Sequence, residues 1–363
     1  MIRAYSLARV LAGSLALASC TPKERSPDER SRAKAPAKKI ALLLPESKTA
    51  RYESKDRPFF EAKVAKECPD YQVLATNANQ DAAQQQAQAE AALTNGVAVL
   101  VLDAVDAASG MAIVMNAKAA NVPVIAYDRL IRGTLGIEYY VSFENEAVGK
   151  LQGEALVRVL AGKTDPRVIM INGAPSDNNG LLFKKGAHSA IDGKLKVLKE
   201  YDTPDWSPDK AQDEMTQALT SVQNQFDGVY AVNDGTAGGV IAAMKAAGVK
   251  PLPPVTGQDA ELAAVQRIVL GEQYMTVYKA IRPQAEAAAV IACDLATGRS
   301  VPAEVTSGKT LNNGAKEVPS VLLVPIAVTR ENVKDTVLRD GFWTKEQVCA
   351  GPYDSACRAI GLL

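Results

Sequence analysis

The chain has 363 residues with 41 basic and 41 acidic side chains, so its formal net charge is zero. This balance provides no basic surface for nucleic acid, and one histidine with no Cys-x-x-Cys spacing argues against a zinc site. We therefore expect no nucleic-acid partner, no metal and no cofactor. The length is sufficient for two domains of ordinary size.

The first twenty residues predict a lipoprotein signal peptide. Arg3 and Arg9 precede a short apolar stretch at 10–18, which is too short to span a bilayer, and Leu-Ala-Ser-Cys follows at 17–20. This ending resembles a bacterial lipobox, so we expect Cys20 to carry the lipid, palmitate included, that anchors the chain to a membrane. An ordinary secretory signal with a chance cysteine is the alternative.

Residues 21–38 are predicted to be a flexible tether. The segment is rich in Ser, Pro, Ala, Lys and Arg, so it cannot bury enough apolar surface to offset the entropy of ordering it.

Beyond the tether, strand-like and helix-like segments alternate. The expected strands are 39–44, 71–75, 97–102, 122–127, 137–143, 167–171, 195–201, 228–232, 254–257 and 274–277. The expected helices are 55–67, 81–94, 107–119, 144–160, 179–191, 207–222, 236–247, 260–270 and 282–296. This alternation predicts an α/β chain with parallel sheets in a doubly wound arrangement.

Polar and aromatic side chains gather where the expected strands end. The strand at 122–127 is followed by Asp128 and Arg129, which together could grip a hydroxyl-rich molecule or could form a local ion pair. The other strand ends bring Arg51, Tyr52, Asp103, Asn172, 176–179, Trp206, Asn233, Asp234, Gln258, Asp259 and Lys279. Because ligands bind at the carboxyl edge of such sheets, we expect these residues to line a cleft.

The mixture of side chains suits a sugar. Hydroxyl groups both donate and accept, and the C–H faces of a sugar ring stack on aromatic rings such as Trp206, with Tyr52 or Phe60 as further candidates. No glycine-rich phosphate loop follows the first strand, which argues against a nucleotide, whereas an amino acid ligand stays open.

Catalysis is not expected in this cleft. Asp128, Asp234 and Asp259 are candidates for the two members of a glycosidase acid/base pair. However, Arg129 adjoins Asp128 and Lys279 is expected near Asp259, and a nearby cation keeps a carboxylate ionised. The expected activity is therefore binding rather than chemistry.

Seven motifs in unbroken order resemble the D-xylose-binding group of type I periplasmic binding proteins, which serve bacterial ABC sugar importers. They are IAYDRLI (125–131), YVSFENE (140–146), PSDNN (175–179), NDGTAGG (233–239), TGQDAEL (256–262), MTVYK (275–279) and LNNG (311–314). The resemblance implies two Rossmann-like lobes joined by three crossovers, near 141–142, 279–280 and 310–311. It places residues 39–141 plus 280–310 in the first lobe and 142–279 plus 311–345 in the second.

The same resemblance implies the sugar contacts and the role. The implied ligand-binding residues are Arg51, Tyr52, Asp128, Arg129, Asn178, Asn179, Trp206, Asn233, Asp259 and Lys279. Tyr52 stands where the group often has tryptophan. The implied role is a monomer that delivers xylose or a similar aldose to an ABC permease and its ATPase, facing the periplasm or the cell exterior. A sensor that presents its closed form to a receptor kinase or chemoreceptor is the alternative.

The C-terminal segment 346–363 has no counterpart in that group. Cys349 and Cys357 flank a turn-rich stretch, so we expect them to form a disulfide, while the pairing of Cys68 with Cys293 stays open.

Overall fold

Residues 38–363 are the part of the chain that the computed structural model describes. The predicted signal peptide, the lipid-attachment residue Cys20 and the tether up to residue 37 lie outside these residues.

The first lobe is built on a seven-stranded sheet with the order β10-β11-β5-β4-β3-β1-β2. Its strands are β1 (Lys38–Leu44), β2 (Tyr71–Asn77), β3 (Val99–Leu102), β4 (Val124–Tyr127), β5 (Ile137–Phe143), β10 (Thr310–Asn312) and β11 (Glu317–Leu323). All neighbours pair in parallel except β10 with β11. The central strands are fully buried apolar runs, as a sheet covered on both faces requires.

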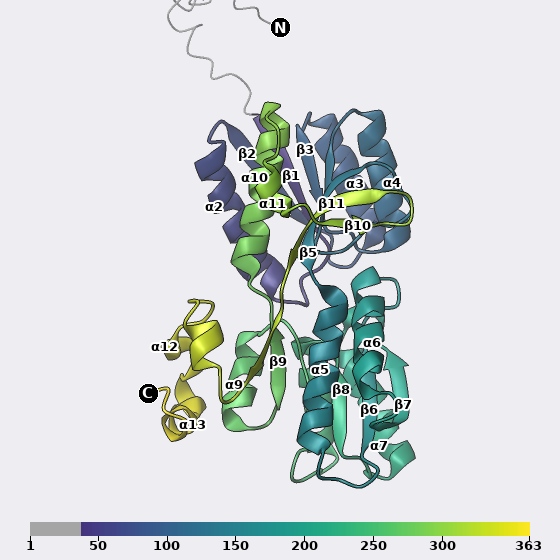
Figure 1. Cartoon of the computed structure of the whole chain (residues 1–363), viewed down its shortest axis with the longest axis vertical. Helices are drawn as coiled ribbons and strands as arrows, with labels where there is room; N and C mark the ends of the chain where they lie inside the picture. Colours follow the sequence, from purple (N-terminus) through teal and green to yellow (C-terminus); the bar gives the residue numbers. More distant parts are fainter. Residues whose placement is uncertain (1–37) are drawn as a thin grey trace, which may run out of the picture. The chain divides into compact units, whose positions relative to one another are not determined.

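Helices cover both faces of this sheet (Figure 1). One face carries α2 (Arg57–Glu67) and α10 (Ile281–Thr297), whose apolar side chains share a core with alternate residues of β1 and β3. The other face carries α3 (Ala82–Thr94) and α4 (Ala107–Ala119). The short helix α11 (Ala303–Thr306) precedes β10.

The second lobe has its own sheets. Its strands are β6 (Arg167–Asn172), β7 (Lys196–Asp202) and β8 (Gly228–Ala231), in the order β7-β6-β8, and the antiparallel pair β9 (Met275–Tyr278) and β12 (Ile326–Thr329). Its helices are α5 (Asn145–Leu160), α6 (Asn178–Ile191), α7 (Pro208–Val222), α8 (Asp234–Ala246) and α9 (Leu262–Leu270). The expected strand at 254–257 is reduced to one bridge between Val255 and Val229.

The chain passes between the lobes after β5, after β9 and after β11. The third passage differs from the prediction, which placed it at 310–311 and gave residues 311–345 to the second lobe. β11 instead pairs with β5 in the first sheet, with Val321 opposite Val141, so the passage lies between Leu323 and Ile326. A short apolar strand such as β11 suits either sheet, and its sequence does not say which one it joins.

The C-terminal segment packs onto the second lobe rather than standing apart. It forms α12 (Lys345–Val348), η4 (Gly351–Tyr353) and α13 (Asp354–Ala359), preceded by η3 (Lys334–Leu338). Val348, Cys357 and Leu362 are buried in one cluster with Val265 and Ile268 of α9. The segment is therefore part of the core of that lobe.

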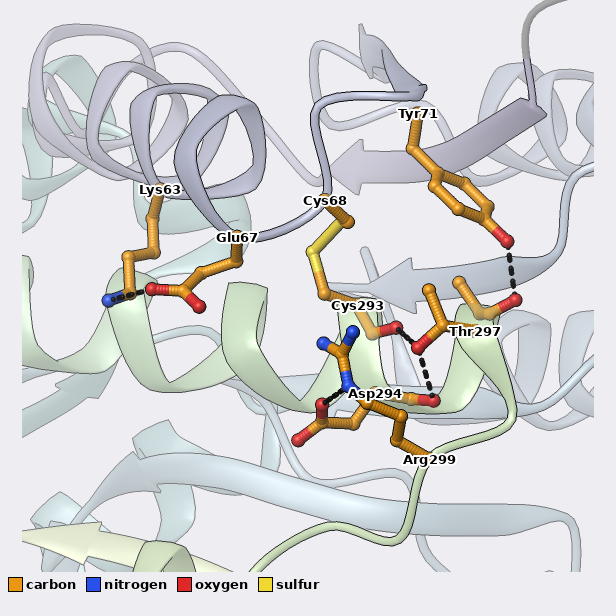
Figure 2. Close-up of a disulfide and its surroundings, with 9 residues drawn as sticks. Lys63, Glu67, Cys68, Tyr71, Cys293, Asp294, Thr297 and Arg299 are labelled. Atoms are coloured by element: carbon orange, nitrogen blue, oxygen red, sulfur yellow. Dashed lines mark hydrogen bonds and ion pairs between the residues drawn. A yellow bond between two sulfur atoms is a disulfide. The ribbon is translucent and has the colours of Figure 1, made fainter.

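Two disulfides link the described cysteines. Cys349 is bonded to Cys357 in the C-terminal segment, and Cys68 is bonded to Cys293, 225 residues later in the chain. The second bond joins the end of α2 to α10, and a hydrogen bond from the Tyr71 hydroxyl to the carbonyl of Ala296 lies beside it (Figure 2). It therefore ties together the two separate chain segments that build the first lobe. Within residues 38–363, no helix is long and apolar enough to cross a membrane.

Candidate functional site

The loop after β1 ends at Arg51 and leads into η1 (Tyr52–Asp56), a short π-helix that presents Tyr52 to the cleft between the lobes. Arg51 is buried and is held from behind by Asp56, which accepts from Nε at 3.0 Å and from an Nη atom at 2.7 Å. Gln284 of α10 accepts a further bond at 2.8 Å. These three bonds fix the guanidinium, whose other Nη atom points toward Asp128 at 3.4 Å.

Asp128 follows the buried strand β4 in a left-handed conformation with φ of 55°, which aspartate tolerates better than most residues. Its carboxylate accepts a hydrogen bond from the Tyr52 hydroxyl at 2.9 Å. Burial alone would raise the pKa of Asp128, but Arg51, and after it Lys279 and Arg129, outweigh burial and hold that pKa well below its usual range. Asp128 is therefore an ionised acceptor.

Arg129 does not pair with the neighbouring Asp128, so the local ion pair left open above is not formed. Its Nε atom lies 3.0 Å from Asp177 of the second lobe and 3.6 Å from Asp103 at the end of β3. One Nη atom donates to the carbonyls of Ala104 and Val105, both at 3.2 Å. Arg129 thus joins the two lobes.

The second lobe contributes the start of α6. Asp177 caps this helix by accepting from the backbone N–H of Asn179 at 2.8 Å, which directs the Asn179 side chain into the cleft. The Asn179 amide donates to the backbone carbonyl of Asp128 at 3.0 Å. This is a second direct bond between the lobes.

Trp206 ends the short helix η2 (Pro204–Trp206), and its indole N–H donates to Asp177 at 3.2 Å. The ring lies against the backbone of Gly173, where a Cβ atom would come within 2.3 Å of the indole. Phe183 of α6 meets Trp206 edge to face at 6.2 Å between ring centres. Two aromatic rings are therefore fixed on the second-lobe side.

Two further strand ends of the second lobe complete the set. Asp259 and Lys279 form a buried ion pair with 2.8 Å between their atoms, and Asp259 lies 3.9 Å from Arg51 of the first lobe. Asn233 caps α8, its side chain accepting from the N–H of Thr236 at 2.9 Å. Each side chain is thus held by a contact other than a ligand.

These residues surround one cavity between the lobes. The space between the atoms that line it, including the part open to solvent, is about 270 Å³. Its lining consists of Thr49, Tyr52, Asp128, Arg129, Asp177, Asn179, Phe183, Trp206, Asn233, Gln258, Asp259 and Lys279.

Of the strand-end residues expected to line the cleft, Asp103, Asn172, Ser176 and Asp234 are not part of the lining. Eight of the ten predicted ligand-binding residues do line the cavity, and two do not. Arg51 stands behind Asp128 rather than in the lining, and Asn178 lies in the grooves outside the cavity, beside Arg132 and Lys150. Asn178 is one helix position before Asn179, so its side chain points about 100° away.

Four lining residues were absent from the ten predicted ligand-binding residues. Two of them, Asp177 and Gln258, were nevertheless among the strand-end residues expected to line the cleft, and both line the cavity. Thr49 and Phe183 carried no comparable signal, because Phe183 lies inside α6 and its spacing matches an ordinary core residue.

A profile of the periplasmic binding protein domain matches residues 40–300. The chain belongs to this family. Its fold is that of the type I periplasmic binding proteins, as predicted, and the family is not one of enzymes.

This periplasmic binding protein has relatives that align over most of its length. It is 39% identical to the D-xylose-binding periplasmic protein of Haemophilus influenzae, over 85% of this chain and 92% of that one. The protein of the same name from Escherichia coli is 38% identical over the same shares. The predicted resemblance to D-xylose-binding proteins is thereby confirmed.

Solved structures agree with the fold. An ABC transporter solute-binding protein from Clostridium phytofermentans with bound β-D-glucose has a TM-score of 0.77 and 29% identity, covering 86% of this chain and 100% of that one. A carbohydrate transporter solute-binding protein from Chloroflexus aurantiacus, in complex with D-glucose, has a TM-score of 0.77 and 30% identity, covering 85% and 97%.

Proposed function

We propose that this protein binds a monosaccharide, xylose or a similar aldose, in the cavity between its lobes. The observation that carries the proposal is the lining itself, where carboxylates, amides and cations lie beside fixed aromatic rings. Sugar hydroxyls need both acceptors and donors, and the apolar faces of the ring need flat partners. The similarity to D-xylose-binding periplasmic proteins supports the same ligand.

The mechanism that we propose is closure of the two lobes on the sugar. The first lobe offers Tyr52, Asp128 and Arg129, while the second offers Asn179 and Asp259 among others. Each lobe alone supplies only part of the hydrogen bonds, so the ligand binds most tightly to the arrangement in which both face it. The passages after β5, β9 and β11 would act as the hinge.

A panel of monosaccharides tests the proposal directly. Residues 38–363 form one compact unit with its own apolar cores, so the chain without residues 1–37 is the protein to use. A sugar at about 100 times its Kd should stabilise this protein by roughly 2.7 kcal/mol, which calorimetry detects as a higher Tm. If xylose, glucose and the other aldoses leave the Tm unchanged, the proposal fails.

We further propose that the mature protein is exported and anchored through a lipid on Cys20. Membership of the periplasmic binding protein family implies export, and the lipobox-like sequence at 17–20 supports the anchor. Cys20→Ser should move the protein from the membrane fraction to the soluble fraction after export. Continued membrane attachment of this variant would contradict the anchor.

Delivery to an ABC permease is the proposed use of the bound sugar. Deleting the gene should abolish uptake of the radiolabelled sugar at low concentration, and restoring it should recover uptake. If uptake persists while the cell loses its transcriptional or chemotactic response to the sugar, the sensor role is the correct one.

A further inference from the structure

Another contact between the lobes lies outside the cavity that is proposed to bind the sugar. It joins η1 of the first lobe to the segment 342–343 of the second, which precedes α12. Lys55 of η1 donates a hydrogen bond to the backbone carbonyl of Phe342 at 2.7 Å. None of these residues lines the cavity.

The Lys55 ammonium also lies over two aromatic rings. It is 4.0 Å from the ring centre of Trp343 and 4.8 Å from that of Phe342. These distances are within the range of cation–π attraction, which is strongest for tryptophan. Phe342 is buried against Tyr278 with 5.1 Å between ring centres, and the half-buried Trp343 packs against Phe342 with 5.4 Å between ring centres. The second lobe therefore offers a rigid receptor for this cation.

Each end of this contact is connected to a residue of the sugar site. Lys55 stands three residues after Tyr52 on the same short helix. On the other side, the Trp343 indole N–H donates to the carbonyl of Ala260 at 2.7 Å, and Ala260 directly follows Asp259. Asp259 and Ala260 both have positive φ, 94° and 51°, so their loop depends on such external bonds.

We propose that Lys55, Phe342 and Trp343 form a latch between the lobes that holds the closed arrangement without touching the sugar. The proposal rests on the proposed function, because it assigns to the Lys55 latch the stabilisation of the sugar-bound form. The latch can form only when the lobes are together, so its contacts stabilise the closed, sugar-bound state relative to the open one. Sugar leaves after the lobes separate, and the latch therefore slows dissociation.

Lys55→Met tests the latch, because methionine keeps an unbranched apolar side chain and removes the charge and the donor. The Kd and the dissociation rate of the best sugar from the panel should both rise by about 3- to 30-fold, with the association rate unchanged. Stopped-flow fluorescence follows these rates, since Trp206 lies in the cavity. Lys55→Arg, which restores a cation over the rings, should recover most of the loss.

Lys48→Met is the matched control. Lys48 is an exposed lysine in the loop before η1, and the same substitution there should leave both rate constants unchanged. If Lys55→Met leaves the dissociation rate within twofold of the wild type, the latch does not exist. An equal loss in the Lys48 variant would also overturn it, because the effect would then come from net charge.

A measurement without sugar separates the latch from the proposed function. Small-angle X-ray scattering of the sugar-free protein reports how far the lobes are apart on average. Lys55→Met should shift the sugar-free protein toward a larger radius of gyration than the wild type and the Lys48 variant. If no sugar binds the wild type, the proposed function fails, while the latch is still judged by this shift: an unchanged radius refutes it.

Discussion

The sharpest test of the cavity is Asp128→Asn, because asparagine keeps the size of the side chain and also tolerates the positive φ of 55° at this position. The substitution removes one negative charge that faces Arg51 at 3.4 Å and the Tyr52 hydroxyl at 2.9 Å. Arg51 retains its two bonds to Asp56, so it is not left without a partner. The fold should therefore survive, with a small decrease in Tm.

The expected loss of sugar affinity follows from one hydrogen bond to a charged acceptor. Such bonds contribute about 1.5–3 kcal/mol, and each 1.4 kcal/mol corresponds to tenfold in Kd. Because the pKa of Asp128 is held well below its usual range, the carboxylate is ionised at neutral pH and the whole difference should appear there. We expect Kd to rise by roughly 10- to 150-fold.

Isothermal titration calorimetry measures this change, with circular dichroism to verify the fold. Asp213→Asn, which removes an exposed carboxylate of α7, is the control for the change in net charge. A Kd for Asp128→Asn within twofold of the wild type, in a folded protein, would refute the assignment of Asp128 as a sugar acceptor.

Three further predictions concern other parts of the molecule. Gly173→Ala should raise Kd roughly 3- to 10-fold in titration calorimetry, because a Cβ atom 2.3 Å from the Trp206 indole displaces the ring that is proposed to stack on the sugar. Burial raises the pKa of the Glu261 carboxyl to about 8 from 4.5. The stability contributed by the protonated carboxyl is therefore fully present below about pH 4.5 and is lost as the pH rises to about 8, so the Tm should fall over this range. Glu261→Gln cannot titrate, so it should make this fall in Tm smaller. Cys68→Ser with Cys293→Ser should lower the unfolding free energy by up to about 5 kcal/mol in urea denaturation, since the bond closes a loop of 225 residues.

Each of these has an outcome that would contradict it. An unchanged Kd for the Gly173 variant would mean that the indole position does not matter for binding. The Glu261 variant and Glu304→Gln, an exposed control, should differ in their Tm–pH profiles, and identical profiles would exclude Glu261 as the titrating group. Equal urea midpoints for the double cysteine variant and the wild type would show that the bond adds no stability.

Much of the fold and of the candidate site could be predicted from local sequence patterns. The buried runs of β3 and β4 and the residues that follow them obey the rule that ligands meet at the carboxyl edge of parallel strands, and this rule alone brought Asp128, Asn233 and Asp259 together. The sequence did not predict which residue at the start of α6 faces the cavity. Asn178 and Asn179 are adjacent and identical, and Asn179 faces the cavity because the Asp177 cap sets the start of the helix and Asn145 and the Asp128 carbonyl hold the Asn179 amide.

The remaining differences depend on contacts between distant segments. The ion partner of Arg129 proved to be Asp177, 48 positions away in the chain, because the second lobe supplies a carboxylate closer than the neighbouring residue can reach. The lobe that β11 joins is likewise set by pairing with β5, about 180 residues earlier in the chain. Neither relationship is encoded in a local pattern.

The order of the cysteines has a consequence for biogenesis. Along residues 38–363 each cysteine is bonded to the next one in the sequence, Cys68 to Cys293 and Cys349 to Cys357. If these four cysteines are oxidised in the order in which they emerge, N-terminus first, each meets its native partner before another of the four is available. Among these four, pairing in sequence order is therefore sufficient to give the native connectivity.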